Sequence, residues 1–270
     1  MDWDDAYANG PHIAGAADYP QRWAAAAAAF RAGLAAAGRA EIDLAYGPAA
    51  RDRLDLFRPE GEPLGLAVFV HGGYWMAFDK SSWSHLAAGA VARGWAVALP
   101  SYTLCPEARI AGITRQAARA ISAAAARVEG AIALSGHSAG GQLVSRMACR
   151  DGPLAFHLRA RLARVISISG LHDLRPLLRT RMNATLGLDA AEATAESAAL
   201  QVPIEGVRVH CVAGDRERPE FRRQNALLAN IWAGLGAETT AAESPGRHHF
   251  DVIADLEDAG SALTRALTGE

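Results

Sequence analysis

Short apolar runs alternate along this chain with longer segments in which apolar residues recur every three or four positions. The short runs have the length of buried strands, and the longer segments have the period of helices packed against a sheet. Strands and helices that alternate in this way predict an α/β protein with a mainly parallel central sheet flanked by helices. The predicted buried strands are Leu66–Val70, Trp95–Leu99, Ala131–Ser135, Arg164–Ser169 and Val207–Val212, and the predicted flanking helices are Trp83–Arg93 and Arg109–Val128.

The segments outside this alternating region carry other patterns. Prolines and aromatic residues among acids predict an ordered but irregular start, and an alanine-rich stretch ended by glycine predicts a helix after it. Alternation of apolar and polar residues favours an antiparallel strand pair at a sheet edge. The predicted elements are an arm (residues 1–20), a helix (Gln21–Ala37, ended by Gly38), an edge pair (Ile42–Tyr46 and Arg53–Phe57) and a terminal helix (Val252–Leu267).

The alternation of strands and helices is interrupted between the last two predicted buried strands. Residues 171–203 are too many for a simple crossover turn; a capped helix is predicted to begin at Asp173, and Asp189–Leu200 continues the helical pattern. In a parallel sheet, ligands bind at the carboxyl ends of the strands, so an insertion there covers the site. We therefore predict one domain over residues 1–270, with an N-terminal arm and helix (1–38) and a small helical cap (171–203). A solvent-facing helical pair without a functional role is the alternative for the cap.

Composition narrows the class of protein. Half of the 270 residues are hydrophobic, enough for one large core, and the formal net charge is -2. A chain without a basic cluster has no electrostatic footprint for nucleic acid or a membrane surface. No apolar run approaches the roughly 20 residues of a membrane span, and the acidic first residues differ from a secretory signal. Widely spaced Cys105, Cys149 and Cys211 are typical of reduced, buried thiols. We expect a cytoplasmic protein with a small-molecule substrate, and no nucleic-acid or membrane partner. The pattern leaves the oligomeric state undetermined.

A serine flanked by glycines occupies a key position in this pattern. Residues 136–140 (Gly-His-Ser-Ala-Gly) join an apolar strand to a segment with helical period. Ser138 therefore lies where a strand reverses into a helix, and the glycines two residues to either side allow the backbones to approach closely. This turn raises the hydroxyl above the sheet edge and places the N–H of Ala139 at a helix N-terminus. The motif is typical of a nucleophilic serine, and a glycine-rich turn capped by serine is the alternative.

A serine hydroxyl is a poor nucleophile unless a base removes its proton and an acid orients that base. For a serine in this kind of turn, the acid and then the histidine follow along the chain. Of the nine histidines, His248 and His249 lie in a loop after the last predicted strand, where a base can reach the serine. The pattern leaves both of them open. His137 belongs to the turn itself, and we expect its side chain to point away from the serine proton.

The acid is expected in the loop that follows the strand ending at residue 212. Asp215, Glu217 and Glu220 all qualify by residue type. Glu220 has an adequate structural role in the first turn of a helix, and Asp215 follows Gly214 as an ordinary turn residue would. Glu217 lies three residues beyond Gly214, a frequent spacing for the acid in hydrolases with this serine motif.

Two glycines after another strand suggest how a reaction intermediate is stabilised. The tetrahedral intermediate of acyl transfer carries an oxyanion that needs preorganised hydrogen-bond donors. Residues 71–74 (His-Gly-Gly-Tyr) follow the strand that ends at Val70, and glycines there let backbone N–H groups turn toward the serine. The candidate oxyanion donors are the N–H groups of Gly73, Tyr74 and Ala139.

Together these motifs resemble the kynurenine formamidase (arylformamidase)-like branch of the α/β-hydrolase superfamily, many of whose bacterial members are described as esterases, lipases or thioesterases. The resemblance implies an α/β-hydrolase fold with Ser138 as nucleophile and His249, immediately before a phenylalanine, as base. It also implies Glu217 as the acid, where eukaryotic members have aspartate. The resemblance covers most of the chain from about residue 66 onward and rests on residues 71–75, 101–104 with Pro106, 136–140, 173–176 and 219–224.

The residues themselves predict acyl transfer to water through an acyl-enzyme, and the resemblance narrows this to a small ester or an aryl formamide. A short-chain carboxylesterase or thioesterase without formamidase activity is one alternative, and a non-catalytic small-molecule-binding member of the fold is another. We expect no cofactor and no metal, because two adjacent histidines are weak evidence for a metal site. Tyr74, Trp75, Trp83 and Tyr102 are candidates for an aromatic wall around a flat leaving group, with simple packing as the alternative.

Overall fold

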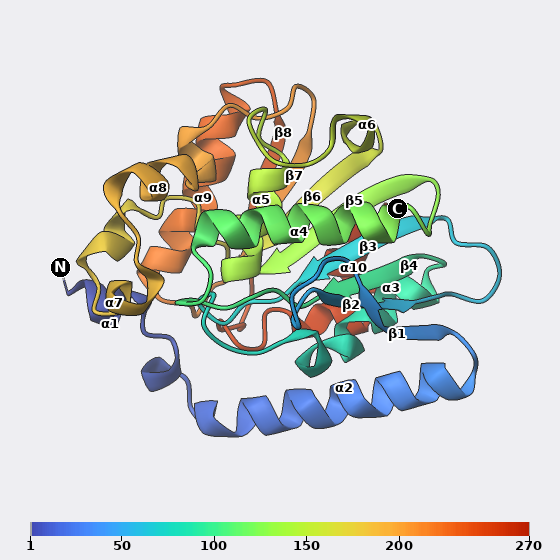
Figure 1. Cartoon of the computed structure of the whole chain (residues 1–270). Helices are drawn as coiled ribbons and strands as arrows, with labels where there is room; N and C mark the ends of the chain where they lie inside the picture. Colours follow the sequence, from blue (N-terminus) through green and yellow to red (C-terminus); the bar gives the residue numbers. More distant parts are fainter. Residues whose placement is uncertain (1, 270) are drawn as a thin grey trace.

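The computed structural model describes residues 2–269 and places one sheet between two layers of helices (Figure 1). Within these residues, eight strands lie in the order β1-β2-β4-β3-β5-β6-β7-β8. The strands are β1 (Ala40–Ala45), β2 (Arg53–Phe57), β3 (Gly65–Val70), β4 (Ala96–Pro100), β5 (Ala131–His137), β6 (Leu162–Ile168), β7 (Arg208–Gly214) and β8 (Glu238–Ser244). The helices are α1 (Trp3–Tyr7), α2 (Tyr19–Ala36), α3 (Ala88–Ala92), α4 (Ile110–Ala125), α5 (Ala139–Met147), α6 (Phe156–Arg159), α7 (Asn183–Leu186), α8 (Ala190–Ala195), α9 (Pro219–Ala233) and α10 (Ala262–Thr268).

The sheet is parallel from β4 through β8, while β1 and β2 are antiparallel at one edge. The predicted α/β class and the predicted antiparallel edge pair are thus both confirmed. The chain order reverses between β3 and β5, which are neighbours although β4 lies between them in sequence. Val70 at the end of β3 pairs with Gly136 in β5. The segments that follow these two strands therefore leave the same edge of the sheet side by side, where ligands bind in open α/β sheets.

Hydrophobic cores fill both faces of the sheet. One core packs α4, α5 and α9 on the strands, and the other packs α2, α3 and α10 on the opposite face. Figure 1 shows α4 and α5 crossing in front of the sheet, with α3 and α10 behind it. Cys105, Cys149 and Cys211 are all buried and free, as expected for reduced thiols. Across residues 2–269, none of the helices combines the length and the apolar character needed to cross a membrane.

Outside residues 171–203, three parts of the predicted pattern differ from the structure. The edge strand β8 was not predicted, because its sequence (Glu-Thr-Thr-Ala-Ala-Glu-Ser) is polar and largely exposed and lacks apolar alternation. The predicted terminal helix over 252–267 is wrong in extent: a 3₁₀ helix (Ala254–Glu257) comes first, and α10 begins only after Ser261, whose side chain accepts from Thr264 N–H. The predicted helix over 83–93 begins as a 3₁₀ helix (Ser84–Ala87) before α3.

Residues 171–203 connect β6 to β7 as a series of short helices. The segment expected to form a capped helix from Asp173 is a 3₁₀ helix (Arg175–Arg179), followed by α7, α8 and a second 3₁₀ helix (Ala198–Leu200). Asp189 caps α8 by accepting a hydrogen bond from Glu192 N–H. These helices contact α1, α5 and α9, so the insertion packs beside the helix that follows residue 138.

Substitution of two helix glycines, one in α5 and one in α2, tests how closely α5 approaches β3. A Cβ built on Gly140, in the first turn of α5, would lie 1.9 Å from the carbonyl oxygen of Val70, whereas one on exposed Gly33 in α2 would meet nothing within 4 Å. We expect Gly140→Ala to lower the free energy of unfolding by about 3 kcal/mol or more through overpacking. Gly33→Ala should raise it by about 0.5–1 kcal/mol, because alanine is the better helix former.

Thermal and urea unfolding of both variants beside the wild type measure this difference. The expected midpoint shifts are about 6 °C or more downward for Gly140→Ala and about 1–3 °C upward for Gly33→Ala. Equal stability of the two variants would contradict the close approach of α5 to β3.

Candidate active site

Ser138 sits at a strained turn between β5 and α5. Its backbone has φ 55° and ψ -115°, a left-handed conformation that costs a non-glycine residue about 1–3 kcal/mol. The turn is held by the hydrogen bond from Ser138 N–H to the carbonyl of Ile168 at 2.8 Å. A Cβ on Gly136 would lie 2.2 Å from the carbonyl oxygen of Gly140. The glycines on both sides are thus required by the close approach of the backbones, as the sequence predicts.

A carboxylate and an imidazole meet directly at the ends of two loops. Glu217 Oε2 lies 2.7 Å from His249 Nδ1, and both side chains are almost completely buried. The other carboxylate oxygen, Oε1, accepts a hydrogen bond from Gly214 N–H at 2.7 Å and one from the hydroxyl of Ser169. Both oxygens of the buried carboxylate are therefore satisfied, and His249 is held with its Nδ1 toward the acid.

The environment of Glu217 favours its charged form. Burial alone would raise the pKa of this carboxyl, but the nearby His249 imidazole and the hydrogen bonds from His249, Gly214 and Ser169 outweigh burial and hold the pKa below its ordinary value. Ser169 was not identified from the sequence. Its φ of 52° and its place directly after β6, next to the end of β7, are the signals that mark it in the structure.

The other candidate acids and the other candidate base do not take part in the contact between Glu217 and His249. Asp215 accepts a hydrogen bond from Gly246 N–H at 2.8 Å and is exposed. Glu220, in the first turn of α9, forms an ion pair with Arg223. His248 faces away from Glu217: its Nε2 lies 3.1 Å from the hydroxyl of Tyr19. Of the candidate acids and bases, the structure brings together Glu217 and His249.

The ring of His249 contacts two other rings close to the serine turn. The ring of Phe221 lies 4.4 Å from the His249 ring, and the ring of His137, the residue before Ser138, lies 4.6 Å from it on centroids. His137 Nε2 is 2.9 Å from the carbonyl oxygen of His249. Burial and then the neighbouring His249 lower the pKa of His137 well below its ordinary value, so its ring is neutral. Among residues 2–269, no hydrogen bond joins Ser138 Oγ to His249.

The loop after β3 lies against the serine turn. A Cβ on Gly72 would come within 3.0 Å of the Cβ of Ser138. Gly73, Tyr74 and Trp75 all have positive φ, which turns their peptide groups away from the course of a strand. In the described part of the chain, the N–H groups of Gly73, Tyr74 and Ala139 donate no hydrogen bond to the protein. Three free backbone donors therefore lie in the segments that meet at Ser138.

Side chains of the core hold the loop after β3 in place. The indole N–H of Trp75 donates to Gln142 Oε1 of α5 at 3.1 Å, and the carbonyl of Trp75 accepts from Cys105 N–H. Trp75, Trp83 and Tyr102 are fully buried in the two cores. Packing, rather than a wall for a leaving group, is thus the role of these three aromatic residues; Tyr102 also stacks on His71 with centroids 4.3 Å apart.

The N-terminal arm closes over the same loop, which the sequence did not indicate. The hydroxyl of Tyr74 donates to the carbonyl of Tyr7 at 2.5 Å and accepts from the side-chain amide of Asn9 at 2.8 Å. The hydroxyl of Tyr7 in turn donates to Glu220 at 2.7 Å. The arm therefore connects the loop after β3 to the start of α9 through hydrogen bonds.

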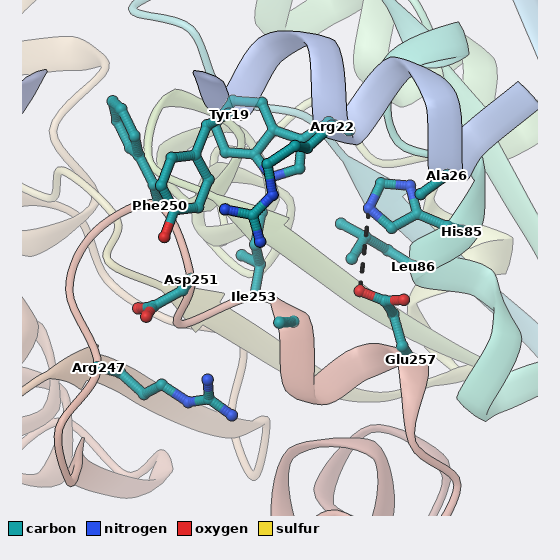
Figure 2. A pocket seen from close by; sticks show the side chains of 12 residues that line it. Tyr19, Arg22, Ala26, His85, Leu86, Arg247, Phe250, Asp251, Ile253 and Glu257 are labelled. Atoms are coloured by element: carbon teal, nitrogen blue, oxygen red, sulfur yellow. Dashed lines mark ion pairs between the residues drawn. The ribbon is translucent and has the colours of Figure 1, made fainter. Parts of the chain in front are cut away.

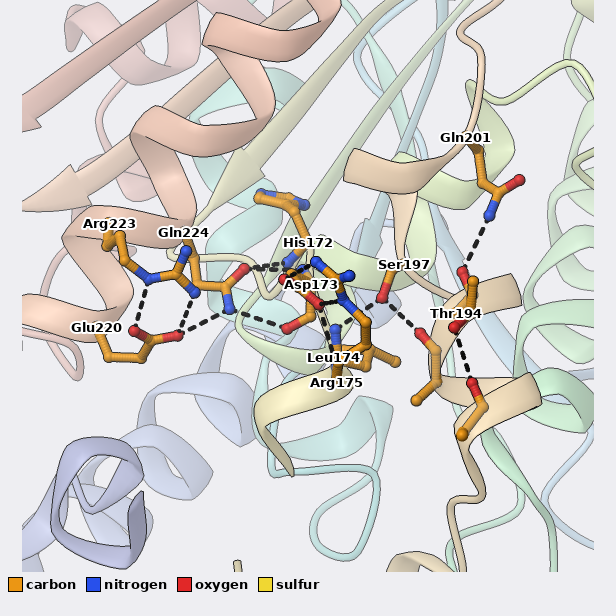
Figure 3. A network of polar contacts seen from close by, with 12 residues as sticks. His172, Asp173, Leu174, Arg175, Thr194, Ser197, Gln201, Glu220, Arg223 and Gln224 are labelled. Atoms are coloured by element: carbon orange, nitrogen blue, oxygen red, sulfur yellow. Dashed lines mark hydrogen bonds and ion pairs between the residues drawn. The ribbon is translucent and has the colours of Figure 1, made fainter. Parts of the chain in front are cut away.

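A polar network continues from α9 into the insertion. Figure 3 shows Glu220, Arg223 and Gln224 of α9 facing the first residues of the insertion. Gln224 Oε1 accepts hydrogen bonds from the N–H groups of His172 and Asp173, each at 2.8 Å. The insertion is thus anchored at its start to the helix that follows the loop of Glu217. In the part of the chain that the structure describes, no group of three His, Cys, Asp or Glu side chains is arranged to hold a metal ion.

The chain is similar in sequence or structure to several known proteins. A family model described as alpha/beta hydrolase fold matches residues 67–202. The kynurenine formamidase of Danio rerio is 25% identical over 84% of this chain and 80% of its own length, and that of Drosophila melanogaster is 25% identical over 85% and 77%. The crystal structure of a putative thioesterase from Silicibacter sp. TM1040 is 51% identical, covers 100% of both chains and has a TM-score of 0.92. An esterase of Pyrobaculum calidifontis, 19% identical over 91% of this chain and 90% of its own, has a TM-score of 0.68 and shares the fold.

The lowered pKa of Glu217 makes a prediction about stability and pH. Because the folded-state pKa lies below the unfolded one, the charged carboxylate stabilises the fold above about pH 4.3, the ordinary value for glutamate, and this contribution is lost as pH falls through the folded value. Glu217→Gln removes it. The difference in unfolding free energy between wild type and variant should be constant near neutral pH and shrink below about pH 4.3.

Urea denaturation of both proteins at several pH values from neutral down to about one unit below the glutamate pKa measures this difference. Glu62→Gln, at an exposed carboxylate, is the matched control and should change stability little at any pH. A Glu217→Gln difference that stays constant down to the lowest pH would contradict the stabilised charge.

Proposed function

We propose that this chain, which belongs to the α/β-hydrolase family, is a serine hydrolase that cleaves a small ester or an aryl formamide. The observation that carries the proposal is the buried 2.7 Å contact between Glu217 and His249 beside the turn of Ser138. A buried carboxylate–imidazole pair is a weak source of stability and a frequent mark of a functional site. Next to a serine on a strained turn, it supplies the orientation that acyl transfer requires.

In the proposed acylation step, His249 Nε2 takes the proton of Ser138 Oγ while that oxygen attacks the substrate carbonyl carbon. Glu217 keeps the proton of His249 on Nδ1 and stabilises the imidazolium that forms. The oxyanion of the tetrahedral intermediate accepts hydrogen bonds from the free N–H groups of Ala139 and of Gly73 or Tyr74.

The intermediate then breaks its bond to the leaving group, which takes the proton from His249 Nε2 and departs as an alcohol, thiol or amine. The acyl group remains as an ester on Ser138 Oγ. In the second half of the reaction His249 deprotonates a water molecule that attacks this ester, and the carboxylic acid is released with Ser138 restored. The proposed reaction uses no cofactor and no metal.

The proposed substrate class rests on the relatives and on the space around the serine. Ser138 and His249 are only 2% and 3% exposed, and the loop after β3 lies against the serine, which favours a compact acyl group such as formyl or acetyl. The curated relatives are kynurenine formamidases, which supports an aryl formamide. The 51% identical relative bears the name of a thioesterase, which supports the rival reading of a short-chain esterase or thioesterase.

The proposed roles predict a sharp contrast between neighbouring residues. Ser138→Ala and His249→Ala should each lower kcat by about 10³-fold or more, because the attacking oxygen or its base is lost. Glu217→Gln should lower kcat by about 10²–10⁴-fold, since an amide no longer stabilises the imidazolium. Steady-state hydrolysis of p-nitrophenyl acetate and labelling by a fluorophosphonate probe measure both effects.

His248→Ala and Asp215→Asn are the matched controls, because each alters the neighbour of a proposed catalytic residue. Both controls should keep activity within about threefold of the wild type, with unfolding midpoints recorded for every variant. Loss of activity in His248→Ala with full activity in His249→Ala would reassign the base. A wild-type protein that the probe does not label would favour the non-catalytic binding alternative.

The proposed small acyl group predicts a chain-length profile. Among p-nitrophenyl esters, kcat/KM should be highest for acetate or butyrate and fall steeply for longer acyl chains, because the serine is covered. A maximum at about eight carbons or more would contradict the small-acyl proposal. N-formylkynurenine tested beside these esters and short acyl thioesters separates the rivals: good ester or thioester turnover with none on the formamide would remove the formamidase assignment and leave the serine mechanism intact.

A further inference from the structure

A second cleft lies on the other side of the loop that carries His249. It has a volume of about 320 Å³ and lies between α2, the 3₁₀ helix before α3, and the segment after β8. Figure 2 shows Arg22 and Tyr19 of α2 reaching over it, with Phe250 beside Tyr19 and with Arg247 and Glu257 opposite. Ser138, Glu217 and His249 are not among the residues that line it. The volume is at the lower end of the range of small-molecule sites, about 300–1,000 Å³.

Two arginines, Arg22 and Arg247, and two carboxylates, Asp251 and Glu257, line this cleft. Arg247 pairs with Asp255, and Asp251 accepts a hydrogen bond from His248 N–H at 2.7 Å. Glu257 faces His85 Nε2 at 4.0 Å. The guanidinium of Arg22 lies over the ring of Tyr19, with Cζ 4.8 Å from the centroid, and among residues 2–269 it has no carboxylate partner and no hydrogen bond. The exposed guanidinium of Arg22 is therefore free to pair with an anion that enters the cleft.

Aromatic rings form the wall beside this guanidinium. The rings of Tyr19 and Trp23 lie 5.4 Å apart, and each is 5.5 Å from the ring of Phe250, at steep angles to it. Edges and faces arranged in this way accept a further flat ring at favourable contacts. The wall is continuous with Arg22, so one small molecule can contact both.

A buried polar atom in the lining is also without a partner. His85 is 5% exposed, and its Nδ1 has no hydrogen-bond partner in the described part of the chain. Burial and then Arg31 lower the pKa of His85 to about 4, so its imidazole is neutral near pH 7 and has a free donor or acceptor. This Nδ1 atom is covered by the protein, so it does not itself contact a ligand in the cleft.

We propose that this cleft is a binding site for a small aromatic carboxylate. Its carboxylate contacts the guanidinium of Arg22, which presents parallel donors suited to two oxygens. Its ring packs against Tyr19 and Phe250. Tyr19 contacts His248 and Phe250 follows His249, so the occupant touches residues on both sides of the proposed base. The site thus lies beside the proposed base, and its existence does not depend on the proposed serine chemistry.

Binding of benzoate to the full chain, measured by isothermal titration calorimetry, tests the proposal without any use of activity. We expect one benzoate per chain and at least about 10-fold weaker binding by Arg22→Gln, the loss typical for a hydrogen bond to a charged group. Arg22→Lys keeps the charge but loses the two parallel N–H donors, so its affinity for benzoate should lie between those of the wild type and Arg22→Gln. Benzamide lacks the charge and acetate lacks the ring, and both should bind the wild type at least about 10-fold more weakly than benzoate does.

Arg150→Gln is the matched control, because it removes an exposed arginine that does not line the cleft and should leave benzoate affinity unchanged. Unfolding midpoints and circular dichroism show that each variant is folded. Equal benzoate affinity of Arg22→Gln and the wild type would overturn the proposal, as would no binding of benzoate at millimolar concentration. Loss of binding in Ser138→Ala with retention in Arg22→Gln would place the benzoate at the serine and also overturn it.

Discussion

The pairing of β3 with β5 is the constraint on which the proposed active site depends. Val70 lies opposite Gly136, so the two strands end together, and the segments beyond them start side by side. The missing side chain of Gly140 then lets α5 begin directly against the carbonyl of Val70. This approach brings the start of α5, with Ala139, next to the end of β3. The donors and the serine thus come from two segments separated by more than sixty residues but fixed by one strand register.

Burial of Glu217 is possible only because its carboxylate meets several donors at once. The desolvation of a charged carboxylate costs several kcal/mol unless hydrogen bonds replace the lost water. Gly214 N–H lies three residues before Glu217 in the same tight turn, Ser169 comes from the end of β6, and His249 comes from the loop after β8. Three strand ends thus converge on one side chain, so the orientation of His249 is determined by the sheet itself.

Local patterns predicted the parts of this protein that depend on local interactions. The strand before Ser138, the glycines around it and the glycines after β3 could all be read from the sequence, because backbone reversal and close approach restrict the residue types. The choice between His248 and His249 could not, since adjacent residues in a loop give no periodicity that shows which ring turns inward. β8 escaped prediction because an exposed edge strand has no buried face to enforce alternation. The contact of Tyr7 with Tyr74 escaped it because residues 67 positions apart leave no local signal.

The N-terminal segment links these observations to the surroundings of the reaction centre. Its arm holds Tyr74 through Tyr7 and Asn9, and the start of α2 holds His248 through Tyr19. Tyr74 belongs to the loop with the free N–H groups, and His248 precedes His249, so the same twenty residues contact both sides of the proposed site. A segment that sequence alone describes as an irregular arm therefore contacts both the loop with the proposed oxyanion donors and the residue before the proposed base.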